Sequence, residues 1–312
     1  MNIIENFGKT YGFDPIRHFN FQKFSGQRDD IDLYLGDATQ RPTNSDQINV
    51  FFDFEQPNSM FPGPGWNTYE TALVREKTFD KIFTINRDVV SKRNQTLENE
   101  KYSYAFFPFN LDYIPEKREP EHDVFFSGHW YGGHYGLHEE VLIPAMNMLQ
   151  SQNPPVHIQT VSANRNRGHA PTYAEKLAAC ASSRITLAYN HMEVGQKFQH
   201  NLQLLQREVA DFCVDGTGRW CTYQLKSRVI EGFMSKTLVF SYEDKWKATE
   251  DFWIPNQHYI PYKNAEDLVQ KINHALENYK KPEYQQIIDN GYEYTKQEYS
   301  TDAFFEKFIK DL

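Results

Sequence analysis

The chain has 312 residues, a length that allows two domains of ordinary size. Aromatic residues make up 15% of the sequence and supply the bulk for real hydrophobic cores. The net charge of −9 argues against a general nucleic-acid binder, because neutralising phosphates requires a basic surface. The three cysteines are irregularly spaced, which predicts neither a disulfide framework nor a zinc motif. We expect a cytoplasmic protein, since the sequence shows no signal peptide and no run of roughly 20 apolar residues that could span a membrane.

The first third of the chain carries three strand candidates, at residues 31–35, 48–54 and 81–85. A loop rich in proline and glycine, residues 55–66, follows the second strand, and a helix is predicted over 68–79. Loops that follow buried strands often line active sites in α/β proteins. We therefore expect this loop to face the functional site.

A charged segment with two prolines, residues 113–122, is interpreted as an interdomain linker. Beyond it the pattern alternates regularly between strands and helices. Strands are predicted at 123–127, 156–161, 185–188, 237–240 and 258–262, and helices at 137–150, 172–181, 223–236, 264–276, 281–294 and 300–312. Strands that alternate with helices indicate parallel sheets, so the fold class is α/β.

The segment from Tyr223 to Phe240 is the most informative one. Apolar residues recur at helical spacing, and a short β-branched and aromatic run follows, as expected for a buried strand. Arg228 and Glu231 lie three residues apart and share the polar side of the predicted helix. A cation suits a phosphate and a carboxylate suits a ribose diol, so the pair indicates a nucleotide-sugar site.

Two α/β domains joined by a linker, with an Arg-x-x-Glu helix leading into a strand, resemble the GT-B glycosyltransferases. More narrowly, residues 120–312 resemble the C-terminal domain of the glycosyl transferases group 1 families, including the CgeB-like branch. The resemblance implies two Rossmann-like domains that face each other across a cleft. Residues 1–115 would bind the acceptor, residues 116–295 would bind the nucleotide sugar, and a final helix over 296–312 would cross back to the N-terminal domain.

The resemblance also implies roles for single residues. Glu231 matches the glutamate that holds the donor ribose hydroxyls, and Arg228 matches the arginine of the CgeB-like branch. Tyr223 stands where retaining members carry a second acidic residue, and we include it among the donor-binding candidates. Lys236 and Leu238 depart from the glycine and proline that are usual there, so the resemblance does not fix the stereochemistry of transfer.

Four further residues are donor-binding candidates. Lys226 precedes Arg228 by two residues and offers a second cation for the diphosphate. Arg165 and Arg167 follow a predicted strand at its carboxyl end, where ligands bind in open α/β sheets. Gly128 opens a glycine-rich turn in which the backbone can approach a phosphate or sugar closely. Solvated surface charge is the competing interpretation of these basic residues.

Catalysis by inversion would require a base on the acceptor hydroxyl. Asp53 and Glu55 end a buried strand and are candidates, as is His129 in the glycine-rich turn. The alternative interpretation of both carboxylates is structural, since Asp and Glu before proline-rich turns commonly accept hydrogen bonds from nearby backbone N–H groups.

A histidine-based metal site is the alternative use of the turn at 129–139. It would draw on His129, His134, His138 and Glu139. The glycosyltransferase interpretation needs no metal and no cofactor, because cations and helix ends can stabilise the leaving diphosphate.

The sequence thus predicts a metal-independent glycosyltransferase that moves a hexose or pentose from a nucleoside-diphosphate sugar to a glycan, glycoprotein or other hydroxyl acceptor. Nucleic acid is expected to be a partner only as a modified base that accepts the sugar. A fucosyltransferase-like enzyme, a sugar-nucleotide epimerase and a non-catalytic nucleotide- or carbohydrate-binding module are the alternatives. The donor sugar, the acceptor and the oligomeric state stay open.

Overall fold

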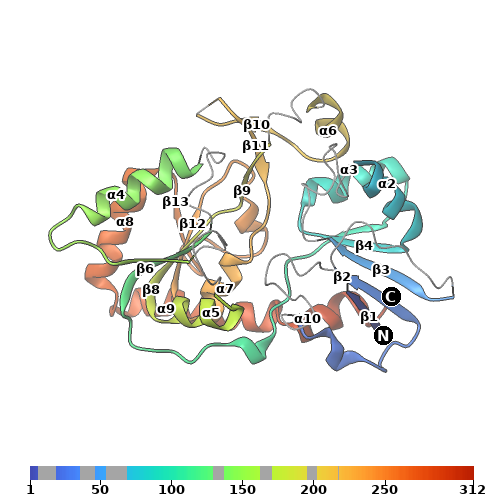
Figure 1. Cartoon of the computed structure of the whole chain (residues 1–312), viewed down its shortest axis with the longest axis horizontal. Helices are drawn as coiled ribbons and strands as arrows, with labels where there is room; N and C mark the ends of the chain where they lie inside the picture. Colours follow the sequence, from blue (N-terminus) through green and yellow to red (C-terminus); the bar gives the residue numbers. More distant parts are fainter. Residues whose placement is uncertain are drawn as a thin grey trace.

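The computed structural model describes residues 1–5, 19–35, 46–53, 69–128, 137–161, 171–194, 202–216 and 218–312. These residues form two five-stranded sheets and one three-stranded sheet, with helices packed against them (Figure 1). Every strand pair in the two larger sheets is parallel. The predicted α/β fold class is therefore confirmed.

The N-terminal sheet follows chain order, β1-β2-β3-β4-β5. Its strands are β1 (Asn2–Glu5), β2 (Ile31–Leu35), β3 (Ile48–Asp53), β4 (Lys81–Thr84) and β5 (Tyr102–Tyr104). Both faces are covered, because neighbouring residues of a strand point to opposite sides. Leu33 and Phe52 join one core and Tyr34 and Phe51 join another. The second core contains Phe79 and Val89, which come from the region of α2 (Tyr69–Thr78) and α3 (Arg87–Leu97).

The C-terminal sheet has the order β13-β12-β8-β6-β7. Its strands are β6 (His122–Ser127), β7 (Ile158–Val161), β8 (Ser183–Ala188), β12 (Leu238–Tyr242) and β13 (Ile260–Tyr262). In Figure 1, α4 (Ile143–Gln150) and α8 (Ala265–Asn278) lie on one face, and α5 (Tyr173–Ala181), α7 (Arg228–Met234) and α9 (Pro282–Glu298) lie on the other. A one-turn π-helix, η4 (His138–Leu142), leads into α4.

The helix predicted from Tyr223 begins later than expected. Tyr223 ends a strand, β11 (Trp220–Tyr223), and α7 starts only at Arg228. The apolar residue at 225 is buried by tertiary packing and not by a helix, which explains why the periodicity was misleading. Lys226 accordingly lies before the helix, outside its register.

The end of the chain returns to the N-terminal sheet. After α9, the short helix α10 (Thr301–Phe304) and the π-helix η8 (Phe305–Ile309) pack beneath it. The ring of Phe304 stacks on Phe52 at 5.3 Å and meets Phe21 edge-on at 5.5 Å. Thr301 donates a hydrogen bond to the carbonyl of Phe19 at 2.5 Å. The last helices therefore link the two domains, although the limits 1–115, 116–295 and 296–312 remain predictions.

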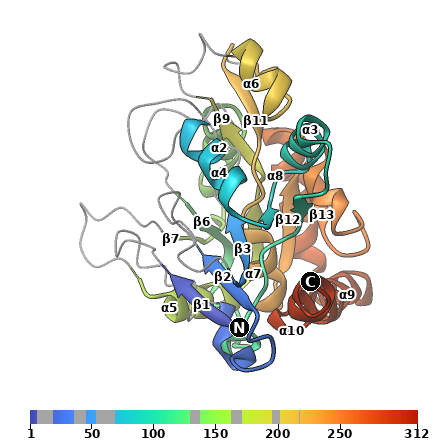
Figure 2. The same cartoon turned by 90° about the vertical axis from the view of Figure 1, so that its right-hand side faces the viewer.

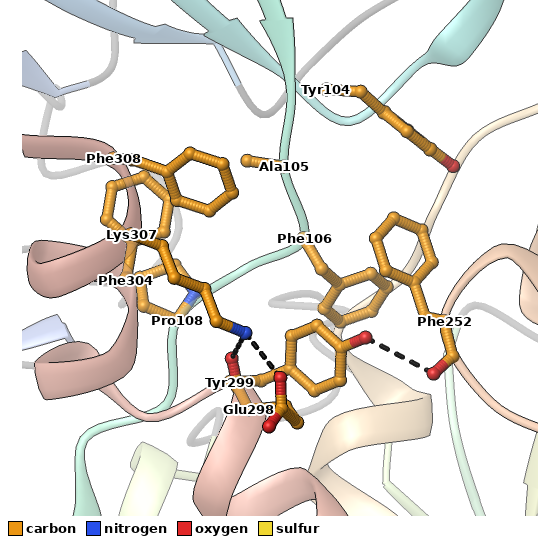
Figure 3. A pocket seen from close by; sticks show the side chains of 10 residues that line it. All are labelled: Tyr104, Ala105, Phe106, Pro108, Phe252, Glu298, Tyr299, Phe304, Lys307 and Phe308. Carbon is orange, nitrogen blue, oxygen red and sulfur yellow. Dashed lines mark hydrogen bonds and ion pairs between the residues drawn. The ribbon is translucent and has the colours of Figure 1, made fainter.

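An aromatic pocket of about 170 Å³ lies where the chain leaves β5 and meets the last helices (Figure 3). The hydroxyl of Tyr299 donates to the carbonyl of Phe252 at 3.2 Å, and Lys307 pairs with Glu298 at 2.5 Å. The pocket is lined by Tyr104, Ala105, Phe106, Pro108, Phe252, Glu298, Tyr299, Phe304, Lys307 and Phe308. The pocket therefore lies between residues 104–108, at the end of β5 and just after it, and the returning helices.

The sequence did not predict the segment between β8 and α7, which we call the strap (residues 191–223). It contains β9 (His191–Glu193), α6 (Leu202–Glu208), β10 (Cys213–Val214) and β11. Its apolar residues Met192, Val194 and Phe212 share a core with Tyr34 and Phe51 of the N-terminal sheet. Figures 1 and 2 both place α6 close to α3. The strap thus leaves the C-terminal domain and packs on the N-terminal one.

Candidate functional site

The carboxyl ends of β6, β7 and β8 meet at one edge of the C-terminal sheet, because parallel strands all end on the same side. Helix α5 begins at this edge after the chain leaves β7. Its start is fixed by a capping box, in which Thr172 and Glu175 satisfy each other's backbone N–H groups. This capping box sets the position of the first turn of α5.

Arg228 is held at the end of β6. Its Nε donates a hydrogen bond to the carbonyl of Ser127. Its guanidinium lies 5.1 Å from the ring centre of Tyr189 and 5.9 Å from that of Phe126. Among the residues that the structure describes, no carboxylate forms an ion pair with Arg228. Aromatic faces and one carbonyl orient this cation without neutralising it, so an anion can still be bound.

Gly128 allows the close approach of Arg228. A Cβ at this position would lie 3.0 Å from Nη2 of Arg228 and 3.0 Å from the ring of Phe126. The N–H of Gly128 donates to the carbonyl of Val161 at 3.0 Å, which ties the ends of β6 and β7 together. The glycine is needed here for space beside the cation, and the expected approach of its backbone to a phosphate or sugar stays a prediction.

Glu231 lies in the middle of α7 and is only 2% exposed. Its carboxylate is 2.6 Å from Nζ of Lys176 on α5. The hydroxyl of Tyr173, also on α5, interacts with the same carboxylate, and burial together with Glu231 raises the pKa of Tyr173. A carboxylate offers about four lone-pair positions, so these two partners do not use all of them.

Lys226 and Tyr223 are placed differently from the expectation. The Nζ of Lys226 donates to the side chain of Gln224, and its backbone N–H donates to Asn190 at 2.9 Å. The buried hydroxyl of Tyr223 accepts hydrogen bonds from the N–H groups of Arg87 and Asp88, at 2.6 and 3.2 Å. Tyr223 therefore caps α3 of the N-terminal domain, and its hydroxyl serves the contact between domains.

The predicted base Asp53 does not face a solvent-accessible site. It is 2% exposed and pairs with Arg75, itself buried, at 2.8 Å. Strand β3 ends at Asp53, and its carboxylate is turned toward Arg75 of α2. We correct this interpretation and treat Asp53 as a structural residue. The other candidate bases, Glu55 and His129, lie outside the described residues.

Arg165 and Arg167 also lie outside the described residues, as does His134 of the alternative metal site. The two described members of that alternative are engaged elsewhere. His138 is buried and shares a hydrogen bond of 2.8 Å with the hydroxyl of Tyr189. Glu139 forms an ion pair with Arg219 at 2.9 Å. These contacts give no support to a metal site built on His138 and Glu139.

Sequence reasoning missed Lys176, Tyr173 and Tyr189. Lys176 and Tyr173 both lie in the first turn of α5, and the capping-box pattern of Thr172 and Glu175 is the sequence signal that marks this turn. Tyr189 follows a predicted strand directly. The three residues were overlooked because nothing in the sequence shows that their side chains converge on Arg228 and Glu231.

The profile of the family described as glycosyl transferase-like matches residues 151–310, which is just over half of the chain. The chain belongs to this family. A search of curated proteins gives no match. The family agrees with the resemblance that the Arg-x-x-Glu segment suggested.

Solved structures of GT-B glycosyltransferases share the fold at low sequence identity. TarM of S. aureus is 11% identical with a TM-score of 0.54, over 89% of this chain and 54% of TarM. HepE of Anabaena, solved with UDP, is 9% identical with a TM-score of 0.53, over 90% of this chain and 78% of HepE. A glycosyltransferase from Rickettsia africae is 13% identical with a TM-score of 0.50, over 98% and 82%.

The predicted architecture, two Rossmann-like domains in the GT-B arrangement, is therefore confirmed. The chain spans only about half the length of TarM. In the part of the chain that the structure describes, no helix combines the length and apolar character needed to cross a membrane.

Proposed function

We propose that the protein transfers a sugar from a nucleoside-diphosphate sugar, bound at the carboxyl ends of β6, β7 and β8, to a hydroxyl group of a carbohydrate-type acceptor. One observation carries this proposal. Arg228 is fixed at the end of β6 by a carbonyl and two aromatic rings, and no described carboxylate neutralises it. An oriented cation of this kind suits a diphosphate, which is both the anchor of the donor and the leaving group.

Lys176 and Glu231 extend this site toward the rest of the donor. Lys176 is 22% exposed and lies in the first turn of α5. In the proposed complex its Nζ turns to the phosphates, and Glu231 then accepts hydrogen bonds from the ribose hydroxyls. Glu231 is too deeply buried to meet a ribose without this exchange, so donor binding and the release of Lys176 are coupled.

Transfer would rest on the positioning of the two substrates and on stabilisation of the leaving diphosphate. Arg228 and Lys176 supply positive charge where negative charge develops, so we propose transfer without an essential metal ion. The acceptor would bind from the N-terminal domain. Glu55 and His129 remain the proposed bases for its hydroxyl, with Arg165 and Arg167 as proposed further contacts to the donor.

The test is a binding screen by thermal shift and calorimetry with UDP, GDP, ADP, CMP and dTDP, each with Mg²⁺ and with EDTA. UDP is the first choice because HepE, a structural neighbour, was solved with UDP and with UDP-glucose. A nucleotide at 100 times its dissociation constant should stabilise the protein by about 2.7 kcal/mol. We expect one nucleotide to do so equally in EDTA.

The matched variants are Arg228→Ala and Arg184→Ala. Arg184 lies at the opposite end of the same sheet, where it pairs with Asp123 at 2.6 Å. The first variant should weaken nucleotide binding by at least about 30-fold, or about 2 kcal/mol, and the second should not change it. No binding of any nucleotide would refute the proposal and favour a carbohydrate-binding module. Binding with hydrolysis or epimerisation of the nucleotide sugar, but no transfer, would favour another GT-B enzyme.

A further inference from the structure

The strap brings cysteine, histidine and aspartate side chains to one point. His191 starts β9, Cys221 lies in the central strand β11, and Asp215 follows β10. One ligand atom from each of these three residues lies within 4.8 Å of the other two. Cys213 pairs with Cys221 across the two strands, and their sulfur atoms are 3.4 Å apart. Three side chains that can bind a metal therefore lie together on one small sheet, and the sulfur atom of Cys213 adjoins this group only through Cys221.

The cluster is buried and one of its atoms lacks a partner. His191 is 6% exposed, and its Nε2 makes no hydrogen bond with any described residue. Cys221 is fully buried. Leaving a buried ring nitrogen without a partner is costly, so its position calls for a ligand.

The surroundings can accommodate an ion. A cavity of about 270 Å³ is lined by the cluster together with Tyr242, Lys245 and Trp246. Asp215 is fixed by a hydrogen bond of 2.9 Å from the backbone N–H of Arg219 to its Oδ1. Such contacts to a ligand side chain orient it toward a metal. Lys245 lines the cavity and supplies positive charge near the cluster, whose side chains become more negative when the two thiols are deprotonated.

We propose that His191, Asp215, Cys213 and Cys221 bind one Zn²⁺ ion in a tetrahedral site. Thiolate and imidazole ligands favour zinc over magnesium or calcium, which prefer oxygen. Two sulfur atoms bound to one tetrahedral zinc lie about 3.8 Å apart, so the sulfur atoms need to separate by only a few tenths of an ångström. Binding releases the protons of both thiols to the solvent.

The site would act as a brace between the domains and is independent of the donor site. Met192, next to His191, and Phe212, next to Cys213, pack in the core that the strap shares with the N-terminal sheet. Tyr223, two residues after Cys221, is bound by the backbone of α3. A metal that fixes β9, β10 and β11 relative to one another also fixes these contacts.

The test is the metal content of the untagged chain, purified without chelators, desalted and measured by mass spectrometry. We expect about one zinc per chain, and less than a tenth of this in His191→Ala and in Cys221→Ser. Cys180→Ser is the matched control, because Cys180 is also buried but lies in α5 beside Thr186. This variant should keep its zinc.

A second measurement does not depend on the folding of any variant. The wild-type chain, stripped of metal and titrated with Co²⁺, should develop a sulfur-to-cobalt charge-transfer band that Zn²⁺ abolishes. Adding EDTA to the zinc form should lower its thermal midpoint without changing that of Cys221→Ser.

Three outcomes would overturn the proposal. The first is a chain that retains no zinc after incubation with an equimolar amount and shows no cobalt band. The second is zinc that Cys221→Ser keeps and Cys180→Ser loses. The third is a thiol titration that finds one thiol instead of three in the unreduced, denatured chain, which would mean that Cys213 and Cys221 form a disulfide. Nucleotide binding plays no part in these results, so they stand apart from the test of the donor site.

Discussion

The two domains hold their inward-facing arginines in opposite ways. In the N-terminal domain, Arg75 pairs with Asp53, and Arg93 pairs with Glu76 at 2.8 Å and with Glu208 at 2.9 Å. In the C-terminal domain, Arg228 has a carbonyl and two aromatic rings around it, and no described carboxylate pairs with it. The charge of a buried arginine that is paired with a carboxylate is already neutralised within the fold. An oriented arginine that has no such partner can still bind an anion. The comparison separates charge that is neutralised within the fold from charge that remains available to a ligand.

The largest effect is expected when a paired arginine loses its partner. Glu76→Ala leaves the guanidinium of Arg93 buried with Glu208 as its remaining carboxylate, and should lower the free energy of unfolding by about 3 kcal/mol. Urea denaturation measures this loss, and nucleotide affinity should stay unchanged. Glu250→Ala, which breaks an exposed pair with Lys247, should cost less than about 1 kcal/mol. Equal losses in the two variants would contradict the distinction drawn above.

A buried carboxylate without a cation gives the next largest effect. Burial raises the pKa of Asp244 to about 6 from its ordinary 3.8, although backbone N–H groups of Trp246 and Ala248 donate to it. The folded state therefore prefers the protonated form, and this stabilisation is complete below pH 3.8 and is lost as the pH rises through 6. The total is about 3 kcal/mol.

The variant Asp244→Asn keeps the hydrogen bonds and removes the titration. The difference in unfolding free energy between wild type and variant should fall by about 2 kcal/mol between pH 4 and pH 7. Chemical denaturation at several pH values measures this difference. A difference that does not change with pH would show that Asp244 is paired after all.

A bulkier residue beside Arg228 should affect nucleotide binding more than the free energy of unfolding. Gly128→Ala places a methyl group 3.0 Å from Nη2 of Arg228 and forces the guanidinium to move. We expect nucleotide affinity to fall by about tenfold, or 1.4 kcal/mol. Ser127→Ala is the control, because it keeps the carbonyl that Arg228 uses. Calorimetry that shows the same weakening in both variants would mean that the backbone, and not the arginine, is responsible.

The smallest effect concerns the contact between domains. Tyr223→Phe removes the hydroxyl that accepts hydrogen bonds from Arg87 and Asp88, and should cost about 1 kcal/mol of unfolding free energy. Nucleotide affinity should not change, because the hydroxyl serves α3. A loss of nucleotide affinity with unchanged stability would instead restore Tyr223 as a donor-binding residue.

Much of the fold could be predicted from local pattern. The strands predicted at 31–35 and 48–54 and the helices predicted from 172, 264 and 300 agree with the structure to within a few residues at their starts, because each depends on residues that are close in sequence. The strap could not be predicted from local sequence patterns. Its strands are two to four residues long, and they are stabilised by a core that belongs to the other domain.

The candidate site divides in the same way. Arg228 and Gly128 could be named from sequence because an Arg-x-x-Glu segment and a strand that ends in glycine are local patterns. Lys176 could not, because its partner Glu231 lies 55 residues further along the chain. Asp53 and Tyr223 were assigned to substrates because the sequence did not show Arg75 and the start of α3 beside them.

The sequence by itself determined the α/β class, the family and the region of the chain in which we propose the donor site, because periodicity, capping and short motifs act over a few residues. Only the tertiary structure decided which charges are neutralised and which remain available to a ligand. The same holds for the cluster of His191, Asp215, Cys213 and Cys221, whose spacing in the chain gives no metal motif. Electrostatic pairing and metal geometry depend on distances of a few ångström between residues that the chain keeps far apart.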